Sequence, residues 1–378
     1  MQKENDSMVN LKDITVFIDP VTNHFQRNEL FNPNSKYNLD NKHEPYFYLR
    51  QLFHSKGIEV HTGDYLMRNE KVNKINVYFS FGIVSNYKRL AKRRDTILSG
   101  FFTFDAPIIL PTVYKKMPEI SRYFKRVYSY STSKALAPFG CGGVKFSKFC
   151  IPQTYHQVFE ELWKKKDRKF LTMINTNKLP RRSYQELYTE RLKALEYFSK
   201  FGEIDLYGFG WDRMPYKVGE TWIPAHLTRL YRFVWEHQPF VKLFPYEEMI
   251  KKVYKGSLNS KYEILSNYTF AICYENMFLQ GWVNEKIFDC FLAGTIPIYL
   301  GVPDITDYVP EKCFIDKRGF STYEELRSFL KSLSAKEIQS YKENAREYFS
   351  SEMFKPFRKE SFAALFTQAV EEDVGVRI

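Results

Sequence analysis

CYENMFLQGWVNEKIFDCFLAGTIPIYLG, residues Cys273 to Gly301, is the stretch of this chain that decides its expected fold. It starts at the end of an apolar run, continues through the helical pattern VNEKIFDCFLAG (Val283 to Gly294) and ends in the almost wholly apolar TIPIYLG (Thr295 to Gly301). A buried strand, a helix and a second buried strand in this order are typical of a parallel α/β sheet. The stretch therefore predicts such a sheet, with a loop between its first strand and its helix.

Polar residues stand where parallel sheets bind ligands. Glu275 and Asn276 follow the first strand, while Asn284, Glu285 and Lys286 open the helix. Asn284 is predicted to cap the helix, because its side-chain oxygen can accept a bond from an early N–H group. The other free N–H groups, the helix dipole and Lys286 would then favour a phosphate, and Glu285 could accept hydrogen bonds from ribose hydroxyls. A plainer interpretation stays open, in which Glu285 and Lys286 are ordinary solvated residues of a helix start.

The sequence before and after this stretch continues the same alternation. Strands are expected over RKFLTMINT (Arg168 to Thr176), EIDLYG (Glu203 to Gly208) and YTFAICYEN (Tyr268 to Asn276), with a long helix over Ser183 to Gly202 and shorter helices in PYEEMIKKVYKG and KYEILSN. After Tyr323 the chain is expected to be mainly helical. These elements predict one α/β domain in the second half of the chain.

The first half shows a similar pattern without a G-x-G-x-x-G motif. Strands are expected over Asp13 to Asp19, Ile58 to Gly63, Ile75 to Phe81, Ile97 to Asp105 and Arg126 to Ser131, with helices over Glu44 to Gly57 and in VYKKMPEISRYFK. The Gly- and Pro-containing stretch Lys134 to Gln153 is predicted to be the crossover between domains.

The whole pattern predicts an α/β protein of GT-B type, with two Rossmann-like domains facing across a cleft. We expect one domain over residues 1–150, a second domain over 151–350, and a C-terminal helix, 351–378, that packs back toward the first domain. Many nucleotide-sugar glycosyltransferases use this architecture, although a fold alone does not establish an activity.

Composition supports a globular protein with an anionic partner. The 378 residues exceed one typical domain, and 44% hydrophobic with 26% charged residues excludes a disordered, collagen-like or coiled-coil chain. The net charge of +12 predicts attraction to nucleic acid, an acidic membrane surface or a phosphorylated small molecule. The five cysteines include no C-x-x-C pair and indicate neither a zinc site nor a disulfide framework.

With these elements in place, the Cys273 to Gly301 stretch resembles the carboxy-terminal signature of family 10 glycosyltransferases, the α-1,3/1,4-fucosyltransferases. That signature is aromatic-Glu-Asn, a linker, aromatic-Val/Ile-Thr-Glu-Lys, a helix and Pro-Ile/Val-aromatic/Val-x-Gly. This chain has Tyr274-Glu275-Asn276, Trp282-Val283-Asn284-Glu285-Lys286 and Pro297-Ile298-Tyr299-Leu300-Gly301. Asn284 stands where the family usually has Thr, and Trp282 where Tyr is common. The resemblance extends over Phe170 to Tyr308 and covers the first half only by general layout.

The resemblance implies an inverting fucosyltransferase of bacterial type. Such an enzyme transfers L-fucose from GDP-β-L-fucose to a hydroxyl of a glycan acceptor, in α-1,3 or α-1,4 linkage. The family-based acceptor is an N-acetyllactosamine-like or lipopolysaccharide glycan. The resemblance then makes residues 151–350 the GDP-sugar donor-binding domain, with GDP-fucose as the donor substrate, and residues 1–150 the acceptor-binding domain, with the glycan as the second partner.

The resemblance also implies roles for individual residues of the donor half. Lys286 resembles the lysine that contacts the donor pyrophosphate, and Glu285 the carboxylate that holds the ribose. Asn276 and Trp282 resemble residues of the donor-site loop. Arg191 resembles an arginine that pairs with the phosphates from the preceding helix.

Two of these assignments keep alternatives. Arg181 and Arg182 are rivals of Arg191, and all three could instead form a basic helix face. Glu275 either orients the sugar or the loop that carries Asn276, or is purely structural. Asn284 retains the capping role that its side chain predicts.

The expected chemistry needs cations at the leaving group and a base at the acceptor. Arg191 and Lys286 would stabilise the charge on the departing GDP, and a carboxylate of the first domain would deprotonate the acceptor hydroxyl. Asp105, which resembles the Glu of an E-x-P segment in some family members, is the candidate base. Its alternatives are Glu44, Asp64 and Glu119, and the nearby histidines His24, His43, His54 and His61 are expected to be structural or to bind the acceptor.

No obligatory metal ion is expected, because the chain lacks the D-x-D motif with which other glycosyltransferases hold a divalent cation. Mn²⁺ or Mg²⁺ is expected at most to stimulate the reaction. The acidic run Glu371-Glu372-Asp373 is interpreted as a solvated tail rather than a metal site.

Location and two rival functions complete the expectations. The amino terminus has no apolar run typical of a signal peptide, and nowhere do eighteen consecutive apolar residues occur. We therefore expect a cytoplasmic protein, at most peripheral to the acidic inner face of a membrane. One rival is a GT-B enzyme for another GDP-6-deoxysugar or nucleotide sugar. The other is a basic nucleic-acid-binding protein, although the chain lacks a zinc finger and an RNP-like motif, so no nucleic acid is expected.

Overall fold

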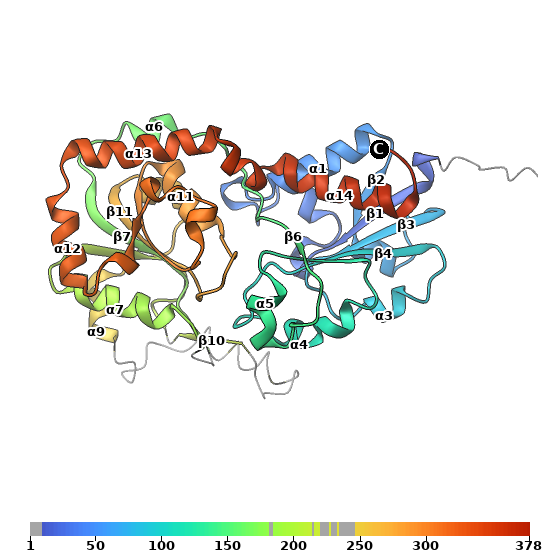
Figure 1. Cartoon of the computed structure of the whole chain (residues 1–378), viewed down its shortest axis with the longest axis horizontal. Coiled ribbons are helices and arrows are strands. Elements are labelled where there is room, and N and C mark those ends of the chain that lie inside the picture. The colour runs from blue at the N-terminus through green and yellow to red at the C-terminus, as the bar shows by residue number, and fades with distance from the viewer. Residues whose placement is uncertain (1–9, 181–183, 214, 220–226, 228–232, 234–245) are drawn as a thin grey trace, which may run out of the picture. The chain divides into compact units, whose positions relative to one another are not determined.

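The chain forms two compact α/β units, each built on its own parallel sheet. A computed structural model describes residues 10–180, 184–213, 215–219, 227, 233 and 246–378 (Figure 1). Within these ranges, the first unit comprises residues 10–105, 112–154 and 355–378, and the second comprises residues 106–111 and 155–354.

The first unit contains a six-stranded sheet in the order β2-β1-β3-β4-β5-β6, with every neighbouring pair parallel. Its strands are β1 (Ile14–Asp19), β2 (Glu59–Thr62), β3 (Ile75–Ser80), β4 (Thr96–Phe102), β5 (Arg126–Ser129) and β6 (Ser147–Lys148). Its helices are α1 (Glu44–Ser55), α2 (Gly63–Met67), α3 (Tyr87–Leu90), α4 (Pro111–Ile120), α5 (Ser133–Leu136) and α14 (Lys359–Val374). The strand order reverses between β1 and β3, which makes that position the topological switch point.

The second unit contains a five-stranded parallel sheet in the order β13-β12-β11-β7-β9 and a two-stranded sheet, β10-β8. Its strands are β7 (Lys169–Ile174), β8 (Lys178–Pro180), β9 (Ile204–Tyr207), β10 (Tyr216–Val218), β11 (Tyr268–Tyr274), β12 (Ile296–Leu300) and β13 (Ile315–Asp316). Its helices are α6 (Glu160–Trp163), α7 (Tyr188–Ser199), α9 (Glu247–Val253), α10 (Lys261–Leu265), α11 (Glu285–Ala293), α12 (Tyr323–Ser332) and α13 (Ala335–Ser350). Here the switch point lies between β7 and β11.

The predicted parallel α/β pattern is confirmed, with three local corrections. β4 ends at Phe102, so Asp105 lies three residues beyond the strand. The helix expected from Ser183, a residue outside the described ranges, begins only at Tyr188, because Gln185 has a left-handed φ of 51° and Glu186 pairs with Met277 in a β-bridge. The stretch 134–153, expected to be the crossover, ends where the chain passes into the second unit, at residues 154 and 155, but it also contains edge strand β6 of the first sheet.

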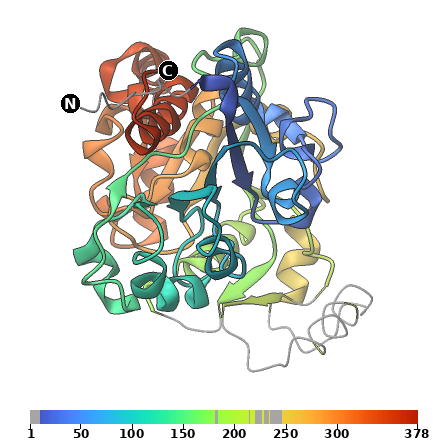
Figure 2. The same cartoon turned by 90° about the vertical axis from the view of Figure 1, so that its right-hand side faces the viewer.

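Aromatic stacking fastens the C-terminal helix to the first sheet. Phe366 of α14 lies over Phe102 of β4, with ring centroids 5.0 Å apart and planes 4° from parallel, and it contacts Phe79 of β3 at 4.6 Å. Phe102 stacks in turn on Tyr128 of β5, at 4.3 Å. α14 also packs against α1, as the red and blue helices of Figures 1 and 2 show. These buried rings account for part of the high aromatic content.

The acidic run in α14 is not the solvated tail that the sequence suggested. The carboxylate of Asp373 is 1% exposed and lies 2.9 Å from Arg126 and 3.2 Å from Lys125. Glu372 contacts Arg126 as well, at 2.6 Å. Because a buried carboxylate needs a positive partner, the run is folded into the first unit by two basic residues at the start of β5.

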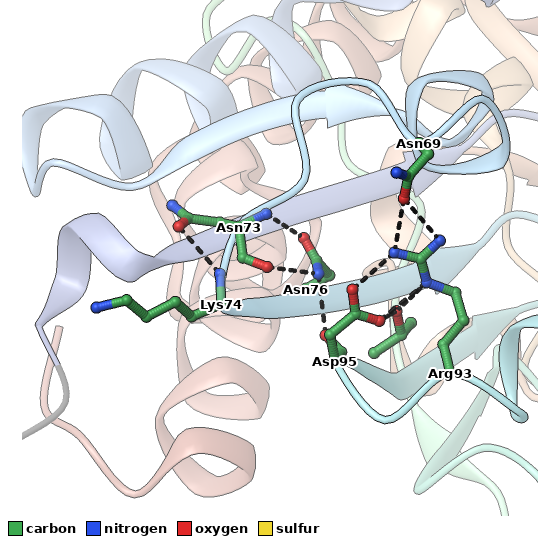
Figure 3. A network of polar contacts seen from close by, with 7 residues as sticks. Asn69, Asn73, Lys74, Asn76, Arg93 and Asp95 are labelled. Atoms are coloured by element: carbon green, nitrogen blue, oxygen red, sulfur yellow. Dashed lines mark hydrogen bonds and ion pairs between the residues drawn. The ribbon is translucent and has the colours of Figure 1, made fainter.

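Polar side chains close the amino ends of β3 and β4 (Figure 3). Asn76 is fully buried; it accepts from the N–H of Asn73 at 2.9 Å and donates to the carbonyls of Asn73 and Asp95 at 2.9 and 3.0 Å. Arg93 donates to Asp95 and to Asn69. This end of the sheet is therefore fixed by internal bonds, whereas ligands of open α/β sheets bind at the carboxyl ends.

The second unit has an aliphatic core beneath its carboxyl edge. Leu171 of β7, Ile298 of β12 and Leu195 of α7 are fully buried, and Ile272 of β11 is nearly so. This packing holds the ends of the central strands in fixed positions. Within the described ranges, no helix has both the length and the apolar character to cross a membrane.

Two histidines of the first unit are buried, and burial shifts their pKa values. His43 is 2% exposed and His61 is 6% exposed, and burial lowers the pKa of each from 6.5 to about 4. Both imidazoles are therefore neutral at pH 7. Because the pKa of each histidine is lower in the folded state than in the unfolded state, protonation favours unfolding. The stability that the neutral imidazoles allow is fully present above pH 6.5 and is lost as the pH falls toward 4.

We expect the free energy of unfolding to fall between pH 7 and pH 5, by about 2 kcal/mol or less for each histidine. The variant His43→Phe keeps a ring against Phe25 and removes the titrating group. Denaturant titrations at several pH values should show a weaker pH dependence for this variant than for the wild type. Identical pH profiles would contradict the assignment.

Candidate active site

A cavity of about 440 Å³ opens at the switch point of the second sheet, between β7 and β11. Its wall combines strand ends, the loop after β9, helix α10 with the residues before it, and the start of α11. The lining residues are Ile174, Asn175, Thr176, Gly208, Phe209, Ser257, Leu258, Lys261, Leu265, Ala271, Ile272, Cys273, Glu285, Lys286, Asp289 and Cys290. Open α/β sheets bind ligands at this position, and the cavity lies wholly within the second unit.

A glycine allows two strand ends to meet beneath the cavity. Gly208 has a φ of 130°, and a Cβ atom there would lie 2.0 Å from the carbonyl oxygen of Asn175. The same oxygen accepts a hydrogen bond from Trp211 Nε1 at 2.6 Å. The end of β7 and the loop after β9 are thus locked together, and only glycine fits at this approach.

Helix α11 begins at the cavity with the predicted cap. The side chain of Asn284 accepts a hydrogen bond from the backbone N–H of Lys286 at 3.1 Å, and Asn284 itself has extended backbone angles. Glu285 and Lys286 occupy the first turn and line the cavity. The first-turn N–H groups and the positive end of the helix dipole therefore lie where an anion could bind.

A buried carboxylate ties the end of β11 to the start of α11. Glu275 is fully buried and accepts from Lys286 Nζ at 3.1 Å and from Asn284 Nδ2. Tyr299 of β12 approaches the same carboxylate at 3.5 Å. A Cβ atom at Gly301 would lie 2.3 Å from Glu275 Cγ, so the glycine that ends TIPIYLG makes room for this side chain.

The cluster keeps Lys286 charged. Burial raises the pKa of Glu275, and the neighbouring Lys286 ammonium works against that shift. Burial alone would lower the pKa of Lys286, but the carboxylates of Glu275 and Glu285 outweigh it, and the pKa of Lys286 lies above its usual value. The Lys286 side chain is 21% exposed, so a protonated amine borders the cavity.

Arg191 supports the loop after β11 rather than the cavity wall. Its Nη2 donates to the carbonyls of Tyr274 and Glu275, both at 2.6 Å, and to Asn276 Oδ1 at 3.1 Å. Its guanidinium lies 4.6 Å from the ring centroid of Tyr188, and its Nε has no hydrogen-bond partner. The rivals of Arg191 in the sequence, residues 181 and 182, lie outside the described residues.

The predicted donor residues thus divide into three groups. Glu285 and Lys286 line the cavity, and Glu275 and Asn284 each form a hydrogen bond with Lys286. Asn276 is bound to Arg191, and Trp282 is 3% exposed with an unpartnered Nε1. Asn276, Trp282 and Arg191 are not among the cavity-lining residues of the described chain.

The cavity also contains polar residues that the sequence analysis missed. Asp289 and Lys261 form an ion pair at 2.6 Å, and Asn175 is 9% exposed with no hydrogen-bond partner for its Nδ2. Asp289 stands four residues after Glu285, a spacing that places both on one face of α11. That spacing was the available signal; nothing local marks Lys261 or Asn175.

The candidate base, Asp105, lies in the first unit beyond the carboxyl end of β4. It is half-buried, and its backbone carbonyl accepts from the Tyr114 hydroxyl at 2.7 Å. Its three alternatives are engaged within the first unit. Glu44 forms an ion pair with Lys359, Glu119 one with Lys88, and Asp64 accepts from Thr62 Oγ1 and the N–H of Arg27.

A further carboxylate of the first unit was overlooked. Asp19 ends β1 at the switch point of the first sheet and is 3% exposed. It accepts from the Tyr78 hydroxyl at 2.5 Å and from Asn86 Nδ2 at 3.0 Å, and burial raises its pKa. Its position as the last residue of a predicted strand was the signal that could have identified it.

The two parallel sheets define an α/β protein of GT-B type. A family model described as "Glycosyltransferase family 10 (fucosyltransferase) C-term" matches residues 164–361, more than half of the chain. The chain therefore belongs to glycosyltransferase family 10, which confirms the resemblance seen in the Cys273 to Gly301 stretch.

Individual relatives agree with this family. The α-(1,3)-fucosyltransferase FucT of Helicobacter pylori is 36% identical over 77 residues, 20% of this chain and 16% of that protein. An α-(1,4)-fucosyltransferase of Arabidopsis thaliana is 35% identical over 69 residues, 18% of this chain and 17% of that protein. The matched segments thus span about one sixth of these two relatives. The sucrose-phosphate synthase of Thermosynechococcus elongatus, at 8% identity and a TM-score of 0.57 over 96% of this chain and 99% of that one, shares the fold.

The cap residue offers a direct test of the buried cluster. We expect Asn284→Ala to lower the free energy of unfolding by about 2 to 3 kcal/mol, because it removes both the helix cap and a hydrogen bond to a buried carboxylate. Asn284→Asp should be less stable still at neutral pH, although aspartate caps as well as asparagine, because it places a second carboxylate against Glu275. Denaturant titration measures the stability of both variants. An Asn284→Asp variant as stable as the wild type would contradict the contact between residue 284 and Glu275.

Proposed function

We propose that the protein is an inverting fucosyltransferase that moves L-fucose from GDP-β-L-fucose to a glycan hydroxyl and forms an α-1,3 or α-1,4 linkage. The observation that carries the proposal is the capped start of α11, where Glu285 and Lys286 line the switch-point cavity. This segment lies within the match to family 10. The names of the relatives, two of them α-(1,3)- and α-(1,4)-fucosyltransferases, support the donor sugar.

The donor nucleotide occupies this cavity in the proposal. Its diphosphate lies at the first turn of α11, against the free N–H groups and Lys286. Glu285 accepts hydrogen bonds from the ribose hydroxyls. Glu275 orients Lys286 from behind and raises its pKa, so that the ammonium remains charged when the diphosphate departs.

The reaction is a single displacement at the anomeric carbon of fucose. The bond between that carbon and the β-phosphate oxygen breaks, and its electron pair leaves with GDP. Lys286 and the helix start stabilise the resulting charge, and Arg191 adds positive charge from the loop that it holds. The acceptor oxygen forms the new bond from the opposite face, and its proton passes to Asp105. Attack from the opposite face converts the β-linked donor into an α-fucoside.

The acceptor in this proposal is a glycan that ends in N-acetyllactosamine or a related β-galactoside, including a lipopolysaccharide chain. The deciding experiment incubates the full chain with GDP-fucose and a glycan array, with mass spectrometry and linkage analysis of the product. An α-fucoside on one class of glycan supports the proposal. Calorimetry with GDP, UDP, ADP and CMP accompanies it, and tighter binding of UDP or ADP than of GDP would overturn the GDP assignment.

Lys286 and Arg191 should each matter for turnover. We expect Lys286→Ala and Arg191→Ala to lower kcat by about 10²-fold or more, because the first removes positive charge at the departing diphosphate and the second removes the guanidinium that fixes the loop after β11. Steady-state kinetics with GDP-fucose measures the loss. Wild-type turnover in either variant would remove that residue from the mechanism.

Stability must be separated from catalysis in these variants, because Lys286→Ala leaves Glu275 buried without its ion partner. The double variant Glu275→Gln/Lys286→Met removes both charges. We expect it to regain much of the lost stability without regaining turnover. Recovery of both together would mean that Lys286 acts only through folding.

Asp105 carries the acceptor half of the proposal. Asp105→Asn should fold normally, bind GDP with wild-type affinity and lose fucose transfer, because the carboxamide cannot accept the acceptor proton. Calorimetry and a transfer assay on the same preparation separate the two effects. Full transfer activity would move the base to Asp19, Glu44, Asp64 or Glu119.

A further inference from the structure

The ion pair between Lys261 and Asp289 has no part in the chemistry described so far, although it lines the donor cavity. Lys261 Nζ of α10 lies 2.6 Å from Asp289 Oδ2 of α11. The Asp289 side chain is 8% exposed and the Lys261 side chain is 26% exposed. Both groups border the same cavity as Glu285 and Lys286.

Part of the cavity wall around this pair is apolar. Leu258, Leu265 and Ile272 line the same cavity. A charged pair set in an apolar wall loses hydration, and its attraction only partly offsets that loss. A ligand edge with matching hydrogen-bond donors and acceptors would compensate for that loss. The unpartnered Nδ2 of Asn175, in the same wall, is an independent sign that a polar ligand fits here.

The position of the pair along α11 matches the order of groups in a nucleoside diphosphate. The helix start and Lys286 provide the phosphate end, and Glu285 provides a carboxylate for the ribose. Asp289 lies four residues beyond Glu285, about 6 Å farther along the helix axis. The ligand group that reaches Asp289 is therefore the base. Phe209, which is 53% exposed and lines the cavity, supplies a ring face on which a base can stack.

The chemistry of the pair selects among bases. A carboxylate accepts two adjacent N–H groups, and an ammonium donates to a neighbouring carbonyl oxygen. Guanine presents this pattern on one edge, with its 2-amino group and N1–H beside O6. Adenine offers an acceptor at N1, and uracil offers a single N–H between two carbonyls. A carboxylate next to an ammonium therefore complements guanine and leaves unmatched groups with either of the other bases.

We infer that Asp289 and Lys261 recognise the guanine base of the donor: Asp289 accepts from N1–H and the 2-amino group, and Lys261 donates to O6. This inference rests on the proposed binding of a nucleoside diphosphate in the cavity, and it assigns the nucleotide specificity to two named side chains. The diphosphate and ribose contacts are common to all nucleotides, so the base contacts decide among them.

Exchange of the carboxylate for a carboxamide provides the test. In Asp289→Asn, the side-chain oxygen still accepts from N1–H, but its Nδ2 donates where the carboxylate accepted. Xanthine carries a carbonyl oxygen in place of the 2-amino group of guanine and so matches the variant. We expect the wild type to bind GDP about 10-fold to 100-fold more tightly than inosine diphosphate or xanthosine diphosphate. Asp289→Asn should prefer xanthosine diphosphate to GDP.

The measurement is calorimetry on the full chain with GDP, inosine diphosphate, xanthosine diphosphate, ADP and UDP. Asp205→Asn is the matched control, because it also breaks an Asp–Lys pair of the second unit, with Lys169 at 2.9 Å, and Asp205 is not a lining residue of the cavity. It should keep the wild-type ratios. A gain of affinity for xanthosine diphosphate cannot arise from partial unfolding.

The outcomes separate this inference from the proposed function. Preference of the wild type for UDP or ADP would overturn the GDP assignment itself. A wild type that prefers GDP to ADP and UDP, with an Asp289→Asn variant that keeps its ratio of GDP to xanthosine diphosphate, would overturn only the roles of Asp289 and Lys261. If Asp289→Asn does not fold, the wild type decides alone: equal affinity for GDP and inosine diphosphate would overturn the inference, because the 2-amino contact would be absent.

Discussion

The second unit of this protein depends on the burial of one carboxylate. Glu275 is wholly enclosed at the end of β11, and such a group is tolerated only when charged and polar partners compensate for its lost hydration. Lys286 and Asn284 are those partners, and both belong to the start of α11. The requirement therefore fixes where the helix begins relative to the strand, and Gly301 of the next segment must lack a side chain to leave space. The burial of this one carboxylate therefore constrains the end of β11, the start of α11 and the residue that follows β12.

The pairing of Glu275 with Lys286 also affects the electrostatics of the cavity. Part of the Lys286 charge is balanced by Glu275, so the lysine alone presents less positive charge to an anion than its formal value suggests. Backbone N–H groups of α11 can also bind an anion. The Asn284 side chain accepts from the N–H of Lys286, and other N–H groups of the first turn have no acceptor within the helix. Arg191 is tied to three oxygens of the loop after β11, and it acts on the cavity mainly by fixing that loop. Preorganised weak donors thus carry a large part of the expected stabilisation, as is usual where charge develops during a reaction.

Local sequence patterns predicted the parts of the structure that local interactions determine. The apolar run TIPIYLG, the helix start at Asn284 and the alternation of strands and helices each depend on residues a few positions apart. The contacts of Arg191 with carbonyls 83 and 84 residues away, and the pairing of Lys261 with Asp289 28 residues away, are made by tertiary packing and leave no local pattern. Edge strand β6 was missed because it has two residues, too few to show an alternation. Asp373 was misjudged because its basic partners, Lys125 and Arg126, lie far away in the sequence.

The two units have the same strand order at their switch points, but the polar residues at those two points differ in how they would interact with an anion. In each sheet the second strand in sequence lies on one side of the first and the later strands lie on the other. At the first switch point, the polar residue at the strand end is Asp19, a buried carboxylate whose hydrogen bonds to Tyr78 and Asn86 are internal. At the second, the carboxylate of Glu275 is likewise satisfied from within, but by the amine of Lys286, which also borders a cavity. A buried acid closed by neutral donors repels a phosphate, whereas a buried acid paired with a lysine at a helix start presents that lysine to it. The shared topology supplies two equivalent places for a ligand, and the partner of the buried acid makes the second place the one that favours an anion.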